Sequence, residues 1–179
     1  GKTLDLHSTI DEKTWEFYQE GMRDLSINAS KELAGKIPVP NGATTLLDIG
    51  GSHGLYSIEL CKMHPNLSSI VLELPGAVEA ASNIAKRYDQ SGKVVHKAGN
   101  ALADDLGESK YDIVMINNVV HHFTNEQNLA LAKKVARALK PNGIYVIGEF
   151  LRNEKPGEGG VMAASTSLYF SLTSSSGNW

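Results

Sequence analysis

Polar side chains follow five apolar runs of the sequence, at the points where strands are expected to end. These residues are Asp48, Glu73, Asn100, the pair His121 and His122, and Glu149. In an open parallel sheet, ligands bind at the carboxyl ends of the strands, where the strand order reverses. Any one of these polar residues could simply lie at a solvent-exposed strand end. Five such groups at the same edge of the sheet favour a ligand site.

A glycine-rich turn, Gly50-Gly51-Ser52-His53-Gly54, follows the first of these strands. Glycine lets the backbone come close to a ligand that a side chain would block, and the free N–H groups of the next helix can hold an anion. Glu73 lies 19 positions after Gly54. An acid at that distance ends the second strand, where its two oxygens can accept both hydroxyls of a ribose.

The same distance fits NAD, but two details favour another ligand. The dinucleotide-binding fingerprint is G-x-G-x-x-G, and Ile49 stands where its first glycine is required. In addition, the negative charge of Asp48 would repel a pyrophosphate. A ligand with an amino group and no phosphate suits this acid better. S-adenosylmethionine (SAM) fits, with its ammonium near Asp48, its carboxylate at the helix start, its ribose at Glu73 and its adenine at Asn100.

Alternating strand-like and helix-like segments from residue 44 onward are expected to position these groups. Strands are predicted at 45–49, 69–72, 93–97, 112–117 and 144–148, and helices at 55–63, after Pro75, and at 125–139. The helix at 125–139 is expected to bury Leu129, Ala132, Val135, Ala136 and Leu139. Pro141-Asn142-Gly143 is expected to form a turn. This pattern predicts the α/β class, with a Rossmann-like, doubly wound and mostly parallel sheet.

Residues 1–43 are expected to form an N-terminal helical linker segment, capped by Asp11 or Thr9. Apolar side chains at Trp15, Tyr18, Met22 and Leu25 recur at helical spacing. Trp15, Phe17, Tyr18 and Met22 could wall a substrate pocket, although packing on a sheet edge or against another segment is the favoured interpretation. The tail at 151–179 offers a glycine-rich loop, a candidate helix at 161–172 and no further strand.

Composition describes one ordinary soluble domain of 179 residues with a formal net charge of −3. The basic residues are spread along the chain, which gives no reason to expect nucleic acid or a membrane surface as a partner. Cys61 is the single cysteine and cannot form an internal disulfide, which fits a cytoplasmic location. Its apolar neighbours predict a buried side chain. No run is apolar and long enough to cross a bilayer.

Four stretches together resemble the class I SAM-dependent methyltransferases. They are Asp48-Ile49-Gly50-Gly51-Ser52-His53-Gly54, Leu72-Glu73-Leu74-Pro75, Val120-His121-His122-Phe123-Thr124-Asn125-Glu126 and Leu139-Lys140-Pro141-Asn142-Gly143. The sequence is most similar to the small-molecule O-methyltransferases typified by plant caffeic acid and animal hydroxyindole enzymes and their bacterial polyketide-tailoring relatives. The resemblance implies a SAM-binding methyltransferase domain over residues 44–179.

The resemblance also implies roles for individual residues. Glu73 stands where the family has the ribose-binding acid, and Asn100 where it has an acid near the adenine. His121 matches the general base of the plant enzymes, and Glu149 the acid that braces it. The implied cofactor-binding set is Asp48, Gly50, Gly51, Ser52, Gly54, Glu73, Leu74, Asn100, Ala101 and Asn117.

Three positions depart from the family pattern. Ser52 replaces a third glycine and disfavours a positive φ there, His122 replaces an acid, and Asn117 replaces a lysine that lines the cofactor pocket.

The chemistry agrees with these roles. A methyl group on a sulfonium is already activated, so an enzyme must align an acceptor and remove its proton. A histidine suits that task near neutral pH, and Glu149 could fix the tautomer of His121. The alternative is that His121 only lines the cofactor pocket. Adjacent side chains are expected to point apart, which leaves His122 a structural or pocket role. Neighbouring histidines rarely ligate one ion, so no metal is expected.

The resulting hypothesis is an enzyme that methylates a hydroxyl of a small aromatic or polyketide-like molecule. Relatives carry an N-terminal dimerisation domain and further C-terminal strands, so this chain is expected to be a C-terminally truncated piece of a homodimeric protein, inactive alone. A non-catalytic SAM-binding module, an N- or C-methyltransferase and, less favoured, a nicotinamide-dependent oxidoreductase remain alternatives.

Overall fold

A computed structural model describes residues 11–149 and 160–173, and its centre is a parallel β-sheet. The strands lie in the order β3-β2-β1-β4-β5. Their bounds are Thr45–Ile49 for β1, Ser68–Glu73 for β2, Val94–Ala98 for β3, Tyr111–Asn117 for β4 and Leu139–Gly148 for β5. The expected fold class is therefore confirmed for the described part of the chain.

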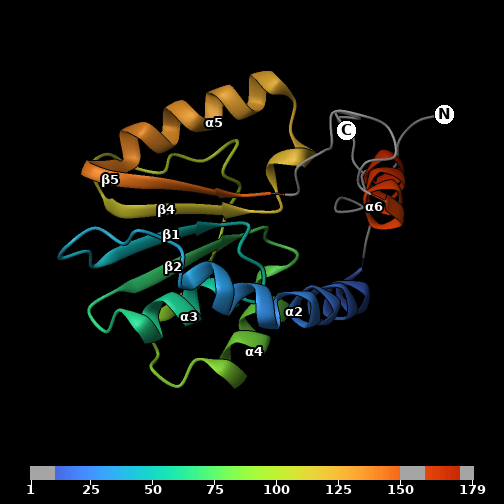
Figure 1. Cartoon of the computed structure of the whole chain (residues 1–179), viewed down its shortest axis with the longest axis horizontal. Helices are drawn as coiled ribbons and strands as arrows, with labels where there is room; N and C mark the ends of the chain where they lie inside the picture. The colour runs from blue at the N-terminus through green and yellow to red at the C-terminus, as the bar shows by residue number, and fades with distance from the viewer. Residues whose placement is uncertain (1–10, 150–159, 174–179) are drawn as a thin grey trace.

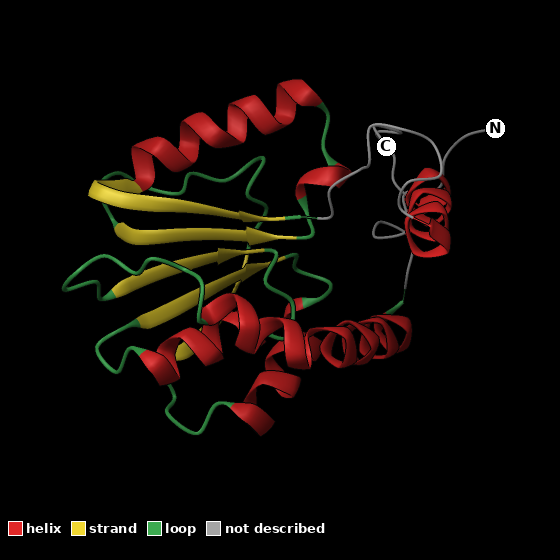
Figure 2. Cartoon of the chain, in the orientation of Figure 1, coloured by secondary structure: helices red, strands yellow, loops and turns green. Residues whose placement is uncertain are grey.

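Helices cover both faces of the sheet, as crossover connections between parallel strands require (Figure 1). On one face lie α2 (Glu12–Ala34), α3 (Leu55–Met63) and α4 (Val78–Tyr88), and on the other lies α5 (Asn125–Ala138). The secondary-structure colouring of Figure 2 shows the three resulting layers. The helix α6 (Gly160–Thr173) follows β5 in sequence.

The strand β4 forms the centre of the core, because Ile113, Val114, Met115 and Ile116 are all fully buried. It pairs with β1 on one side and β5 on the other. A strand covered on both faces is expected to be apolar without alternation, and this prediction is confirmed. Cys61 is also buried in the core, as expected.

The strand order reverses between β1 and β4. From β1 the chain proceeds outward through β2 and β3, then crosses to the other side of β1 to enter β4. The loops that leave the carboxyl ends of β1 and β4 therefore diverge and open a crevice between them. Gly50 follows β1 and Val119 follows β4, so both lie at this crevice.

Two expectations about the last part of the sheet need correction. The strand β5 begins at Leu139, not at residue 144, because Tyr111 pairs with Leu139 before Ile113 pairs with Ile144. The expected Pro141-Asn142-Gly143 turn therefore sits inside β5 as an irregularity, where Asn142 has φ 64°.

The buried face of α5 also differs from the expectation. It consists of Leu131, Val135 and Ala138. Leu129, which was expected in the core, is exposed. The sequence of α5 offers two overlapping apolar stripes at helical spacing, and only packing decides between them.

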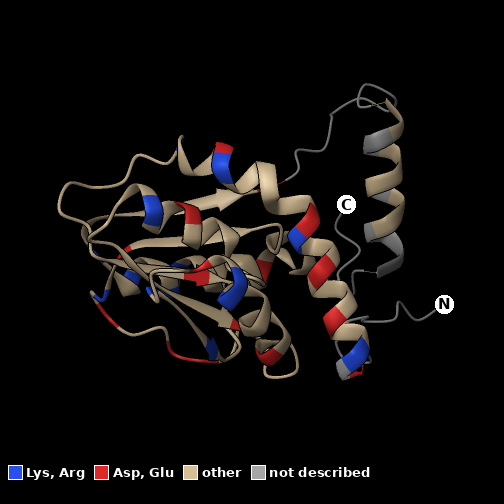
Figure 3. Ribbon diagram, turned by 90° about the horizontal axis from the view of Figure 1, so that it is seen from below, with Lys and Arg blue, Asp and Glu red and all other residues tan. Residues whose placement is uncertain are grey.

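Residues of both charge signs are interspersed along the described ribbon (Figure 3). They alternate along the exposed side of α2, where Arg23 pairs with Glu20 and Asp24. Among the described helices, none is both long and apolar enough to span a membrane.

Replacing Ile116 with alanine should lower the free energy of unfolding by about 2–5 kcal/mol, because the cavity left in β4 cannot collapse. Ile147, its pairing partner on β5, is 54% exposed and provides a matched control. Ile147→Ala should cost about 1 kcal/mol or less. Urea unfolding followed by circular dichroism measures both values, and equal losses would contradict this assignment of the core.

Candidate functional site

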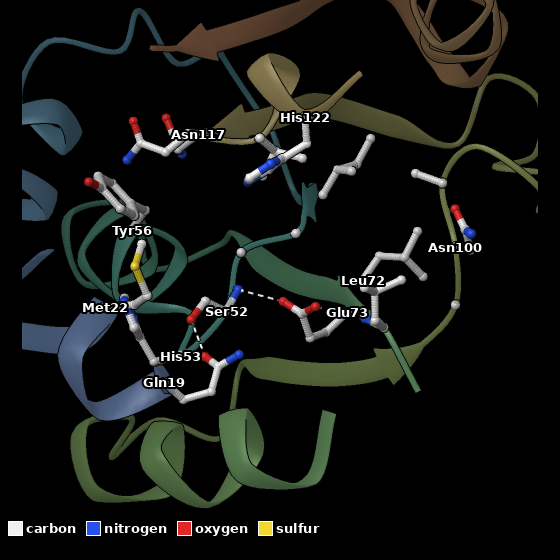
Figure 4. A pocket seen from close by; sticks show the side chains of 18 of the residues that line it. Gln19, Met22, Ser52, His53, Tyr56, Leu72, Glu73, Asn100, Asn117 and His122 are labelled. Carbon is white, nitrogen blue, oxygen red and sulfur yellow. Dashed lines mark hydrogen bonds between the residues drawn. The ribbon is translucent and has the colours of Figure 1, made fainter. Parts of the chain in front are cut away.

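A cavity of about 340 Å³ lies at the crevice, bounded by the loops that leave β1, β2, β3 and β4 and by α2. Eight of the predicted cofactor residues line it: Gly50, Gly51, Ser52, Glu73, Leu74, Asn100, Ala101 and Asn117. Asp48, Gly54, His121 and Glu149 do not line it. Figure 4 shows Asn117 and His122 across the cavity from Glu73 and Gln19.

The glycine turn is a close steric fit to its surroundings. A Cβ atom on Gly50 would lie 2.9 Å from a methyl group of Val119, and one on Gly51 would overlap the carboxyl group of Asp48. Gly50 and Gly54 also have positive φ values, 63° and 72°. The turn can therefore follow this path only with glycine at these positions.

Ser52 adopts the left-handed conformation that its side chain disfavours, with φ 53°. Three contacts hold it there. Its N–H donates to Glu73 Oε2 at 3.0 Å, its hydroxyl donates to Gln19 Oε1, and its carbonyl bonds to Nε2 of His96 at 2.8 Å. The loop therefore keeps glycine-like geometry despite the serine, because neighbouring side chains compensate for the strain.

Glu73 ends β2 with its carboxylate at the cavity wall (Figure 4). Its Oε1 accepts from the Leu74 N–H at 2.7 Å, while Oε2 accepts from Ser52. Burial raises the pKa of Glu73, and the two backbone hydrogen bonds oppose that shift. Each carboxylate oxygen can accept two hydrogen bonds, so one acceptor position on each remains for a ligand.

Asp48 does not line the cavity, which corrects the expectation that it approaches a bound ammonium. It lies beneath the glycine turn with no exposed surface, and its Oδ2 accepts from the Ser57 hydroxyl at 2.7 Å. Ser57 in turn accepts from Ser69 at 2.8 Å. Burial raises the pKa of Asp48 to about 7. In this structure Asp48 supports the turn from below.

Asn117, at the end of β4, carries a buried side-chain amide that lines the cavity. Neither its Nδ2 nor its Oδ1 has a hydrogen-bond partner among the described residues. A buried amide without partners costs free energy, so such a group is typical of a ligand contact. Asn117 can offer a ligand both a donor and an acceptor.

The loop after β3 forms another wall of the cavity. Asn100 Oδ1 accepts from the Leu102 N–H at 3.0 Å, and the Asn100 N–H donates to Asp104 Oδ2 at 2.7 Å. These two bonds fold the loop into a tight turn that presents Ala101 and Leu102 to the cavity.

The two histidines lie on the short 3-10 helix η1 (Val120–His122), between β4 and α5. A capping box starts α5, in which the Thr124 hydroxyl accepts from the Gln127 N–H and Gln127 Oε1 accepts from the Thr124 N–H. Asn128 Nδ2 donates to the Val120 carbonyl at 3.0 Å. These contacts fix η1 against the start of α5.

His121 is buried, and its Nδ1 lies 3.0 Å from Oε2 of Glu149. Its Nε2 lies 2.9 Å from Nε2 of His122. The expectation that the two adjacent side chains point apart is therefore wrong, because the tight 3-10 turn brings their ring centroids within 4.0 Å. His122 lines the cavity and His121 does not.

The helix α2 forms one wall of the cavity, which the favoured interpretation of the sequence did not predict. Trp15, Tyr18, Gln19, Met22 and Ser26 follow helical spacing and all line the cavity. Phe17, grouped with them in the sequence, is 69% exposed. Gln19 and Ser26 follow the same helical period, but both are polar, so a pattern of apolar residues does not include them. The favoured interpretation, packing on a sheet edge or against another segment, did not include this contribution to the cavity wall.

His53 and Tyr56 are further lining residues that sequence reasoning missed. His53 Nδ1 accepts from the Leu55 N–H at 3.1 Å, which places the ring at the start of α3. Burial lowers the pKa of His53 to about 4 and raises the pKa of Tyr56. Their neighbours in sequence give no pattern that distinguishes them from core residues.

Gly51→Ala should lower the free energy of unfolding by about 1–3 kcal/mol, because the new methyl group would displace the Asp48 carboxyl group. Gly21 on α2 is the control, since a Cβ there meets nothing within 4 Å. Gly21→Ala should raise the same free energy by about 0.5–1 kcal/mol. Chemical unfolding of both variants checks this, and a neutral Gly51→Ala would refute the steric fit.

Asp48→Asn should change how stability depends on pH. Between about pH 4 and the Asp48 pKa of about 7 the folded protein keeps a proton that the unfolded chain has released, so stability falls as pH rises. This group contributes at most about 1.4 kcal/mol per pH unit, which asparagine removes. Measured by urea unfolding, the stability of the variant relative to the unmodified protein should rise from about pH 5 to about pH 7. A constant difference would contradict the prediction.

Comparison with known proteins gives relatives over most of the chain. The chain is 29% identical over 136 residues to 3-hydroxy-5-methyl-1-naphthoate 3-O-methyltransferase of Streptomyces sahachiroi, covering 76% of this chain and 39% of that protein. It is 28% identical over 179 residues to L-tyrosine C(3)-methyltransferase of Streptomyces lavendulae, covering 99% of this chain and 48% of that protein. The chain thus spans less than half the length of these two relatives.

A solved structure of human N-acetylserotonin methyltransferase with SAM has the same fold. Its TM-score is 0.74 at 18% identity, over 93% of this chain and 51% of that one. The model of the O-methyltransferase domain family matches residues 3–178. With nearly its whole length matched, this chain belongs to the O-methyltransferase domain family.

Proposed function

We propose that this domain binds SAM in the cavity at the crevice and transfers its methyl group to a hydroxyl of a small aromatic or polyketide-like molecule. The observation that carries the proposal is that Glu73 and Asn117, on opposite sides of the cavity, both have hydrogen-bonding capacity that no described residue uses. Glu73 has an open acceptor position on each oxygen, and Asn117 has a buried amide without partners among the described residues. Both line the same cavity beside the glycine turn.

The residues present fit the parts of this cofactor. Glu73 suits the two ribose hydroxyls, the backbone of Gly50 and Gly51 admits close approach, and Asn117 suits a group that both donates and accepts. Asn100 and Ala101 also line the cavity, and we expect them to contact the adenine. When bound, SAM supplies a methyl group on a sulfonium, which needs an aligned acceptor and no further activation.

The chain's own residues supply the proton transfer and the acceptor wall. His121, held by Glu149, belongs to the histidine pair that accepts the acceptor proton as the new bond forms. Trp15, Tyr18 and Met22 present aromatic and thioether surface on the α2 side of the cavity. Aromatic rings and a polarizable thioether suit an aromatic acceptor.

A carbon acceptor is the second candidate, because one of the two relatives described above is named for C-methylation of L-tyrosine. A phenol activates its own ortho carbons once its proton is removed, so the same base serves either atom. Identification of the methylated product decides between oxygen and carbon.

Several expectations stay predictions: a homodimer in the full-length protein, a cytoplasmic location, and the division into a helical linker at 1–43 and a methyltransferase domain at 44–179. Residues of α2, which lies in the segment 1–43, line the cavity. This supports the view that the domain at 44–179 needs that segment to complete its cavity.

Calorimetric titration should show that S-adenosylhomocysteine binds to the protein and that NAD does not. Glu73→Gln should weaken this binding about 10-fold or more, because hydrogen bonds to a charged group contribute about 1.5–3 kcal/mol. The amide of glutamine would also turn an N–H group toward the Ser52 or Leu74 N–H. Glu79→Gln, on the exposed surface of α4, is the control and should leave affinity unchanged.

Transfer of radiolabelled methyl from SAM to phenol, catechol, caffeic acid and 1-naphthol tests the reaction itself. At least one of these acceptors should be labelled by the full-length protein. Binding of NAD with no response to S-adenosylhomocysteine would remove the proposal in favour of an oxidoreductase. Binding without labelling of any acceptor would favour a non-catalytic SAM-binding module.

A further inference from the structure

Glu149, His121 and His122 form a continuous hydrogen-bonded chain that ends at the cavity. The carboxylate meets Nδ1 of His121 at 3.0 Å, and Nε2 of His121 meets Nε2 of His122 at 2.9 Å. The His121 side chain is only 4% exposed, whereas His122 lines the cavity. A base at His121 is therefore connected to the cavity through a second imidazole.

The carboxylate determines where the protons of this chain sit. An ionised carboxylate accepts only, so His121 must donate through Nδ1. A neutral His121 then has its lone pair on Nε2, and the bond to His122 requires a proton on Nε2 of His122. The lone pair of His122 is left on Nδ1. One charge thus fixes both tautomers and makes Nδ1 of His122 a proton acceptor.

We propose that His122 is a further catalytic residue, which takes the acceptor's proton and passes charge to His121. The inference rests on the proposed methyl transfer and specifies its proton path. The hydroxyl proton moves to Nδ1 of His122 as the oxygen bonds to the methyl carbon. The proton on Nε2 of His122 moves to Nε2 of His121, so the imidazolium forms beside Glu149.

This arrangement separates two tasks that one histidine would otherwise combine. His122 contacts the acceptor from the cavity wall, while the positive charge is stabilised one ring further back, against a carboxylate. His121 and Glu149 act through His122 and are positioning residues. Electrons balance, because the pair of the broken carbon–sulfur bond stays on sulfur and the hydroxyl oxygen supplies the pair of the new bond.

Nitrogen NMR of histidine-labelled protein tests the tautomers without any acceptor. In the spectrum of the protein with both rings neutral, His121 should be protonated on Nδ1 and His122 on Nε2. His121→Gln and His122→Gln assign the signals, and His64, at the end of α3, is the internal reference. A neutral His122 protonated on Nδ1 would overturn the proposal.

Variants of Glu149 separate tautomer control from packing. Glu149→Leu removes the acceptor, so both histidines should shift toward a mixture of tautomers. Glu149→Gln retains an acceptor oxygen, so the tautomers should be restored while the charge that stabilises the imidazolium is lost. Unchanged tautomers in Glu149→Leu would overturn the relay, because a residue that only packs would have this result.

Kinetics then separate transfer through His122 from direct transfer to His121. With the phenol, catechol, caffeic acid or 1-naphthol acceptor that is labelled, His122→Gln should lower kcat by about 100-fold or more with little change in KM. Gln keeps a donor toward His121 but cannot accept a proton. His64→Gln is the matched control and should retain kcat. Retained kcat in His122→Gln would overturn the proposal, whereas no labelling of any acceptor would refute the proposed function and leave the tautomers to decide this inference.

Discussion

The contact between the glycine turn and the carboxyl group of Asp48 is the constraint on which the site depends. A side chain at Gly51 would overlap that carboxyl group, and one at Gly50 would press on Val119. The turn therefore rests directly on the end of β1 and meets the loop that leaves β4. This close approach sets the position of Ser52, whose N–H holds one oxygen of Glu73. Burial of Asp48 without a counter-charge raises its pKa to about 7. A neutral, hydrogen-bonded Asp48 is well suited to support a turn, since a buried charge would need compensation.

The helix α2 closes the cavity that opens at the carboxyl ends of the strands. Gln19 binds the hydroxyl of Ser52, and Trp15, Tyr18 and Met22 close the side of the cavity opposite β4. Ser52 adopts a backbone conformation that glycine would occupy at no cost, so the hydrogen bond that its hydroxyl donates to Gln19 on α2 compensates for a departure from the family pattern. The aromatic wall and the cofactor loop are thereby joined through one helix, and a change in the packing of α2 would affect both.

Much of the fold could be predicted from the sequence, because its signals are local. The uninterrupted apolar run of β4, the glycine turn and the capping residues each require only neighbouring positions to be recognised. The buried face of α5 could not be predicted, since two apolar stripes satisfy the helical period. The cavity lining was predicted where a residue follows a strand end, as with Glu73, or where the family resemblance implies it, as with Asn117. Asp48 does not face the cavity, because a turn that close to the strand covers it. Gln19 is polar and therefore stands outside the apolar pattern of its helix, and the glycine turn that contains His53 does not reveal which way that side chain points. The contact between His121 and His122 depends on a 3-10 turn that sequence periodicity does not indicate.

Together, these features describe a cavity that we propose holds one nucleoside-sized ligand, with His122 of the histidine pair in its wall. A crystal structure of the protein with S-adenosylhomocysteine tests this claim most directly. We expect the adenosine in the cavity, the two ribose hydroxyls on the two oxygens of Glu73, and a hydrogen bond from the ligand to the Asn117 amide. A ligand seated outside this cavity, or inside it with Glu73 making no contact to the ribose, would contradict the claim.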